Sequence, residues 1–317
     1  MALQPRDPSP PQGGLRPLQA AGVIQPHPIK AAKPPPPQDT RWRLHWLLAA
    51  PHRLGFFGGA LMLAISALWW CIELYARSSG MPVAWSVSPS TAHALTMTLG
   101  FMPLFFVGFL FTAGPKWLGM PEPGTRALLP QVLTYLAGWI LALVGFHASV
   151  LLATAGLVLV AAAWSSLAWK FTDLWRRSRA RDKAHATVVT IACLFGVLAL
   201  WLIAGGLAFG LDTLVRTATQ AALWMFIATV FATVSHRMIP FFSASALPVL
   251  DAWRPMWLLW SMVSILWLEG LFAVLDLWLW PLPGALRWLQ VAVEAPAGAL
   301  MLWLAIRWGL VQSLKIR

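Results

Sequence analysis

Eight long apolar stretches follow one another along most of this 317-residue chain, and they constrain its fold more than any other feature. Each stretch has about the 20 residues that an α-helix needs to cross the hydrocarbon core of a bilayer. At that depth the backbone has no water to bind, so such stretches cross the membrane as helices. The sequence therefore predicts an all-α, polytopic integral membrane helix bundle, with spans at residues 54–76, 93–114, 127–146, 149–169, 185–209, 217–236, 256–276 and 285–306.

The composition excludes a water-soluble fold. Hydrophobic residues make up 59% of the chain and charged residues only 11%, whereas about a quarter of the residues in soluble domains are charged. The 23 Lys and Arg residues outnumber the 11 Asp and Glu residues, which in a soluble chain would favour nucleic acid as a partner. Here the basic residues lie in short loops between apolar spans. We therefore expect the lipid bilayer as a partner and no binding of nucleic acid.

Positive charge alternates along the loops. Lys and Arg are frequent before the first span, between the fourth and fifth, between the sixth and seventh, and after the eighth. The loops on the opposite side contain little more than Arg77, Arg216 and Arg287. Basic loops face the cytoplasm in membrane proteins. The pattern predicts that both termini are cytoplasmic and that the protein lies in a bacterial inner membrane.

The first forty residues differ from the rest. Proline recurs up to the run Pro34–Pro37, aromatic residues are absent, and no apolar stretch precedes a signal-peptide cleavage site. Such a composition is typical of disordered segments. We expect a disordered, Pro-rich cytoplasmic tail at residues 1–40 and a transmembrane helical domain at residues 41–317.

Two glycine patterns bear on helix packing. Gly55–Gly59 and Gly206–Gly210 have the Gly-x-x-x-Gly spacing that lets membrane helices approach closely. In a glycine-rich membrane protein the same spacing also arises without a packing role, so both interpretations stay open.

His93 and Met97 form a candidate metal site near the start of the second span. They are four residues apart, which puts them on the same helix face. Histidine with methionine is a known ligand set for haem iron and for copper. The alternative is an interfacial histidine with a methionine that only packs. The topology puts His93 and His147 on the outer side, and puts His52, His185 and His236 on the cytoplasmic side.

Two His-Arg pairs are candidates for cofactor binding at the cytoplasmic side. His236 and Arg237 begin the segment HRMIPFF at residues 236–242, whose proline and two aromatics we expect to end the sixth helix. Arg237 is suited to pair with an acidic group such as a haem propionate. His52 and Arg53 have the same arrangement. Each arginine also fits a simple positive-inside anchor, so both interpretations stay open.

Two carboxylates fall well inside the spans, Glu269 in the seventh and Glu294 in the eighth, and Glu73 lies near the outer end of the first. Both Glu269 and Glu294 are expected in the outer half of the membrane, facing each other or His93. Intramembrane carboxylates act as proton relays, as cation sites or as hydrogen-bonded helix contacts, and all three stay open. No Walker A loop, dinucleotide fingerprint or serine-nucleophile elbow is present, so we expect no nucleotide-driven transport, and the catalytic residues are unknown.

Three segments resemble signatures of the NnrS family. Residues 51–59, PHRLGFFGG, are similar to its opening motif of a basic residue before paired phenylalanines. Residues 93–117, HALTMTLGFMPLFFVGFLFTAGPKW, resemble its second-helix motif. Residues 236–242, HRMIPFF, resemble its Arg-x-Ile-Pro-Phe-Phe signature. Order and spacing agree across most of residues 51–255.

The resemblance implies a multi-helix bacterial inner-membrane protein that carries haem and copper and is tied to protection against nitric oxide. His93 and Met97 match the second-helix motif, and Arg237 matches the later one. The family motif has a second histidine and a glutamate where this sequence has Leu95 and Thr96. Family members usually have more helices than the eight expected here, which implies a short variant or a fragment of a longer product.

Three functions stay open at this point. The resemblance favours a haem-linked membrane protein that binds nitric oxide and contributes to nitrosative-stress tolerance, with Glu269 and Glu294 as its proton relay. Prolines and carboxylates inside the spans also fit a transporter or channel for a small solute or a metal. The Pro-rich tail would suit a non-catalytic assembly or sensory subunit. The sequence does not decide whether the chain is an enzyme.

Overall fold

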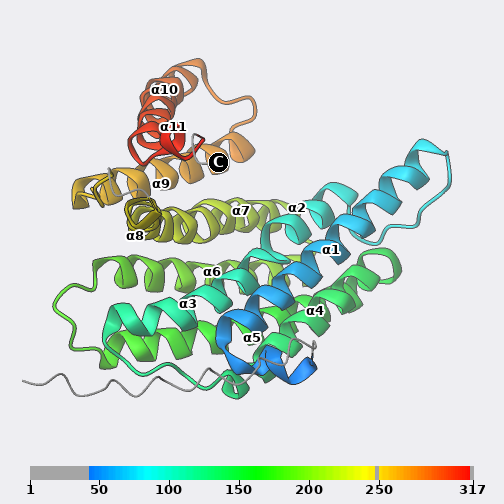
Figure 1. Cartoon of the computed structure of the whole chain (residues 1–317). Coiled ribbons are helices and arrows are strands. Elements are labelled where there is room, and N and C mark those ends of the chain that lie inside the picture. Colours follow the sequence, from blue (N-terminus) through cyan, green and yellow to red (C-terminus); the bar gives the residue numbers. More distant parts are fainter. Residues whose placement is uncertain (1–42, 247–249, 315–317) are drawn as a thin grey trace, which may run out of the picture. The chain divides into compact units, whose positions relative to one another are not determined.

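The computed structural model describes residues 43–246 and 250–314, and every regular element in these ranges is a helix (Figure 1). Within them, eight helices or helix groups are long and apolar enough to cross a membrane, which confirms the predicted fold class and number of spans. These eight spans are α1 (Pro51–Ser78), α2 (Pro89–Leu99) with α3 (Met102–Leu118), α4 (Leu129–Ala148), α5 (Val150–Arg177), α6 (Ala184–Ala208), α7 (Asp212–Ala221) with η3 (Ala222–Ala228) and α8 (Thr229–Ala246), α9 (Met256–Trp278), and α10 (Gly284–Arg307).

Three short helices flank these spans: η1 (Leu44–Ala49) before α1, η2 (Thr125–Ala127) before α4, and α11 (Leu310–Ser313) after α10. The disordered tail that we expect at residues 1–40 lies outside the described residues.

Consecutive spans run in alternating directions, so the helical region has two ends, and these differ in charge. We call the end at which α1 begins and α3 ends the basic end, because it carries Arg53, Lys116, Arg254 and most other basic residues. The charge-poor end is the one at which α1 ends and α2 begins.

Close contact between α1 and α3 depends on glycine. A Cβ atom at Gly55 would lie 2.3 Å from the backbone nitrogen of Gly108 and 2.8 Å from the carbonyl oxygen of Leu104. A Cβ atom at Gly59 would lie 3.0 Å from the ring of Phe105. The Gly55–Gly59 pattern is therefore a true packing site, at which two helix backbones meet with no side chain between them.

Close backbone contact at glycines also joins α4 to α5. A Cβ atom at Gly145 would lie 2.1 Å from the Ala153 nitrogen, and one at Gly156 would lie 2.5 Å from the Ala142 nitrogen. The second sequence pattern differs in kind, since Gly210 has a φ of 67° and nothing within 4 Å. Gly210 therefore serves the turn after α6, where only glycine adopts this conformation without strain.

The second span is interrupted at Gly100 and Phe101, between α2 and α3. Pro103 has no N–H, so the Leu99 carbonyl four residues earlier loses the donor that a continuous helix would supply. The Tyr135 hydroxyl of α4, which is buried, donates to this carbonyl instead. The interruption therefore leaves no unpaired polar group at this carbonyl.

The sixth span differs from the expectation at its end. The sequence predicts that Pro240 and the two following phenylalanines end the helix, whereas α8 continues to Ala246. A proline inside a helix removes one hydrogen bond and disturbs the carbonyls of the preceding turn. The carbonyl that loses its donor is that of His236, four residues before Pro240. Arg254 donates at 3.2 Å to the following carbonyl, that of Arg237, and so ties the connection to the next span to this turn.

We expect Gly55→Ala to lower the midpoint of thermal unfolding in detergent, because its Cβ atom would overlap the α3 backbone. Forcing extra atoms into a packed contact costs about 1–3 kcal/mol. The matched control is Gly205→Ala in α6, where a Cβ atom would have nothing within 4 Å. Tryptophan fluorescence on heating measures both variants, and equal midpoints would contradict the packing role of Gly55.

Candidate functional site

His93 has an imidazole nitrogen available for a ligand. Its ring stacks on Trp70 of α1 with centroids 4.0 Å apart and an angle of 25° between the planes. Its Nδ1 atom is buried and has no hydrogen-bond partner among the described residues. An unsatisfied buried polar atom costs about 1–3 kcal/mol, and an imidazole nitrogen is a common ligand of haem iron and copper.

Met97 follows His93 by one helical turn and is half-buried like it. Among the residues that the structure describes, no group of three or more His, Cys, Asp or Glu side chains lies close enough to hold a metal ion. The protein ligands that α2 offers to a metal are therefore the imidazole of His93 and the thioether of Met97.

His147, at the turn between α4 and α5, is held by three contacts. Its Nδ1 donates to the Ala84 carbonyl at 3.0 Å, because a carbonyl can only accept. Its Nε2 accepts from Trp69 Nε1 at 3.0 Å and also lies 3.3 Å from Glu73 Oε1. These contacts hold the imidazole of His147 beside the Glu73 carboxyl at the charge-poor end.

The loop from α1 to α2 is fixed against the same turn. The ring of Trp85 packs on His147 with centroids 4.4 Å apart. The backbone nitrogen and the hydroxyl of Ser86 donate to the Phe146 and Gly145 carbonyls. Trp69 and Trp70 are neighbours on α1, and their rings lie 5.6 Å apart. Through these two tryptophans the pair Glu73–His147 and the His93 ring belong to one aromatic cluster.

A second centre lies at the basic end, where His185 of α6 meets His236 of α8. Both side chains are buried, at 3% and 0% exposure. His236 Nε2 donates to the Pro255 carbonyl at 3.1 Å, so its Nδ1 accepts from His185 Nε2 at 2.9 Å. His185 Nδ1 in turn accepts from the Arg237 guanidinium at 3.4 Å. One chain of hydrogen bonds therefore fixes the tautomers of both rings.

The histidine pair differs from His93 in what it offers a cofactor. All four ring nitrogens of His185 and His236 already take part in hydrogen bonds. A metal at His236 would have to displace either His185 or the Pro255 carbonyl. This arrangement does not fit an additional ligand, whereas His93 does.

Arg237 joins two of the motifs that the sequence singles out. Its guanidinium packs over the ring of Trp117, 4.9 Å from the centroid, and Trp117 lies in the last turn of α3. Arg237 is half-buried and forms no ion pair with a carboxylate in the described part of the chain. It therefore offers its charge to an anionic group at the basic end.

The two centres do not meet. His93 and Trp117 lie at opposite ends of one span, 24 residues apart in sequence, which corresponds to about 36 Å of helix. Because Arg237 packs on Trp117, it is as far from His93. One cofactor cannot contact both groups, so His93 and Arg237 belong to separate candidate sites at opposite ends of the spans.

The other candidates lie apart from these centres. His52, at the basic end, has a buried Nδ1 atom without a partner among the described residues, and Arg53 packs over Trp46 at 5.9 Å. Glu269 and Glu294 face each other across α9 and α10, and Gln290 donates to Glu294 at 2.5 Å. Glu269 is half-buried, whereas Glu294 is exposed on the surface of α10.

We expect His185→Leu and His236→Leu to destabilise the protein strongly when made singly. Each leaves the other ring buried with an unpaired nitrogen, which costs about 1–3 kcal/mol. The double variant removes both polar rings and should cost less than the sum of the two. The thermal midpoints of the wild type, the two single variants and the double variant in detergent give this double-mutant cycle. The control is His45→Ala, whose side chain is exposed. Additive losses would show that the two rings do not stabilise each other.

No curated protein and no solved structure matches the chain. The family model described as NnrS protein matches residues 46–317, which include all eight spans and both histidine centres. The match covers most of the chain and agrees with the three motifs quoted above. This multi-span membrane protein therefore belongs to the NnrS family.

Proposed function

We propose that this protein is a haem-linked membrane protein that contributes to nitric oxide tolerance in a bacterium. Its family and its span architecture support the proposal, and the observation that carries it is the buried, unpaired Nδ1 atom of His93. The proposed location is the inner membrane with the basic end toward the cytoplasm, as the positive-inside rule favours. Nitric oxide is a small apolar gas and dissolves readily among apolar spans.

His93 is the residue best suited to hold haem, and Met97 is the second ligand that α2 offers. Haem iron supplies a site for a diatomic gas when it is bound. A thioether also favours copper in its reduced form, so His93 with Met97 is equally the proposed copper site. His236 is less suited, since both of its ring nitrogens are occupied. His52 has a free buried nitrogen and is the corresponding candidate at the basic end.

A redox step needs protons as well as a metal. Glu269 and Glu294 are the proposed relay for them, because their carboxyls face each other across two spans. No hydrogen bond or ion pair joins either of them to His93 in the described part of the chain.

The absorption spectrum and metal content of detergent-purified protein test this function. We expect a Soret band in the wild type, its loss or a large shift in His93→Ala, and an unchanged band in His45→Ala, whose side chain is exposed. Wild-type protein without haem would overturn the proposal, and solute uptake by such protein would favour a transporter instead. A band that survives unchanged in His93→Ala would move the ligand elsewhere, with His52→Ala as the next variant.

A further inference from the structure

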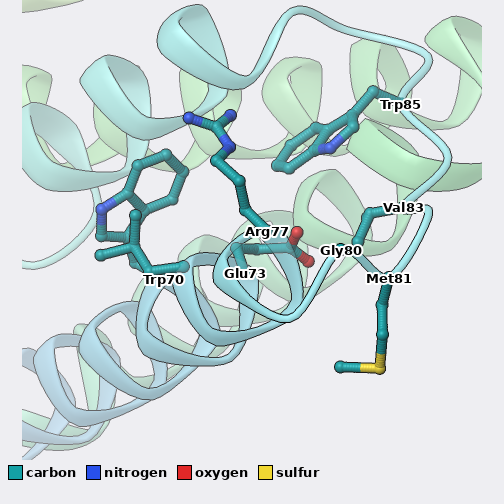
Figure 2. A pocket seen from close by; sticks show the side chains of 8 residues that line it. Trp70, Glu73, Arg77, Gly80, Met81, Val83 and Trp85 are labelled. Atoms are coloured by element: carbon teal, nitrogen blue, oxygen red, sulfur yellow. The ribbon is translucent and has the colours of Figure 1, made fainter.

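A hollow of about 260 Å³ lies at the charge-poor end, between the last turns of α1 and the loop to α2. Figure 2 shows its walls, which include Trp70 and Glu73 from α1 and Trp85 from the loop, with Arg77 extending among them. No step of the proposed function uses this hollow or its arginine.

Arg77 has a charge that the fold itself does not use. Its guanidinium is exposed and forms no ion pair with a carboxylate in the described part of the chain. Arg287, at the same end, is paired with Asp276 at 2.9 Å. Arg77 also lies at the end where basic residues are rare, so the positive-inside rule does not explain it. A guanidinium offers a planar set of donors that matches a phosphate group.

Glu73 supplies the opposite charge one helical turn away. Its side chain is only 12% exposed, and its Oε1 atom faces His147 at 3.3 Å. Its second oxygen, Oε2, has no hydrogen-bond partner in the described part of the chain. A carboxylate between the faces of Trp70 and Trp85 is suited to an ammonium group, because aromatic faces attract cations.

The spacing between the Glu73 carboxylate and the Arg77 guanidinium favours a zwitterionic ligand. Residues four apart on a helix have Cβ atoms about 5–6 Å apart, so Glu73 and Arg77 present neighbouring sites for a cation and an anion. Phosphoethanolamine carries its phosphate and its ammonium only two carbons apart. Both groups of such a molecule can therefore reach Arg77 and Glu73 at once.

The surroundings favour a lipid as the source of this group. Tryptophans such as Trp70 and Trp85 gather at headgroup depth in membrane proteins. Leu74 lines the hollow itself, and Leu63, three turns earlier on the same face of α1, is also exposed, so acyl chains can lie along this face. We propose that the hollow binds the headgroup of a phosphatidylethanolamine lipid, with the phosphate on Arg77 and the ammonium on Glu73.

Native mass spectrometry of the full chain, stripped of lipid in detergent, tests the proposal. The probes are palmitoyl-oleoyl phosphatidylethanolamine, phosphatidylglycerol and phosphatidylcholine. We expect the wild type to prefer phosphatidylethanolamine, because phosphatidylglycerol lacks the amine and phosphatidylcholine cannot donate to Glu73. Arg77→Gln should weaken its binding about tenfold, as for one lost charge-assisted contact. Glu73→Gln should abolish the preference over phosphatidylglycerol.

Arg287→Gln is the matched control, since it removes an arginine at the same end whose charge is already paired. We expect it to leave lipid binding unchanged. Equal binding of the three lipids by the wild type, or equal losses in Arg77→Gln and Arg287→Gln, would overturn the site. Circular dichroism and thermal midpoints equal to the wild type ensure that a loss in Arg77→Gln reports on binding.

Soluble phosphoethanolamine, titrated against the same protein by tryptophan fluorescence, identifies the source of the group. We expect it to bind much more weakly than the lipid, because it lacks acyl chains that contact α1. Binding as tight as that of the lipid would overturn the lipid assignment in favour of a soluble ligand. Haem content is measured on the same samples, so failure of this proposal is distinguished from failure of the proposed function.

Discussion

The hydrogen bond from the Tyr135 hydroxyl to the Leu99 carbonyl lets the second span break without leaving that carbonyl unpaired. Inside a bilayer a backbone carbonyl has no water to bind, so a break survives only where another group replaces the missing donor. Pro103 has no N–H to donate to the Leu99 carbonyl, and the Tyr135 hydroxyl of α4 donates instead. The break gives the span two separate helices, and each carries a residue of a different centre: His93 on α2 and Trp117 on α3.

Much of the fold could be predicted from the sequence, because a bilayer reduces the choice to apolar helices of fixed length. The eight predicted spans agree with the helices to within a few residues, except where α5 and α8 extend beyond the apolar core. The continuation of α8 through Pro240 could not be predicted, because a proline in an apolar stretch is compatible both with the end of a helix and with a helix that continues after losing one hydrogen bond. The packing of neighbouring segments decides between the two, and the local sequence does not show it.

The candidate site could be predicted only partially. Charge alternation put His185 and His236 at the same side, but their contact depends on how α6 packs against α8, which no local pattern encodes. The contact between Glu73 and His147 was missed for the same reason, although the dense tryptophans near it were a usable signal. His93 and Arg237 lie in separate motifs of the family, and the predicted topology put them at opposite sides, in agreement with their places at opposite ends of the spans. The NnrS signature therefore covers two centres of different chemistry: one with an imidazole nitrogen free, and one with every ring nitrogen engaged.

The glycine contact between α1 and α3 has a mechanical consequence. With Gly55 against Gly108 there is no side chain between the two backbones that could change rotamer and absorb a displacement. The helix α1 continues without interruption from Pro51 to Ser78, and it carries His52 near one end and Glu73 near the other. The helix α1 therefore links groups at both ends of the spans in one continuous segment, and its contact with α3 at Gly55 has no side chain that could adjust.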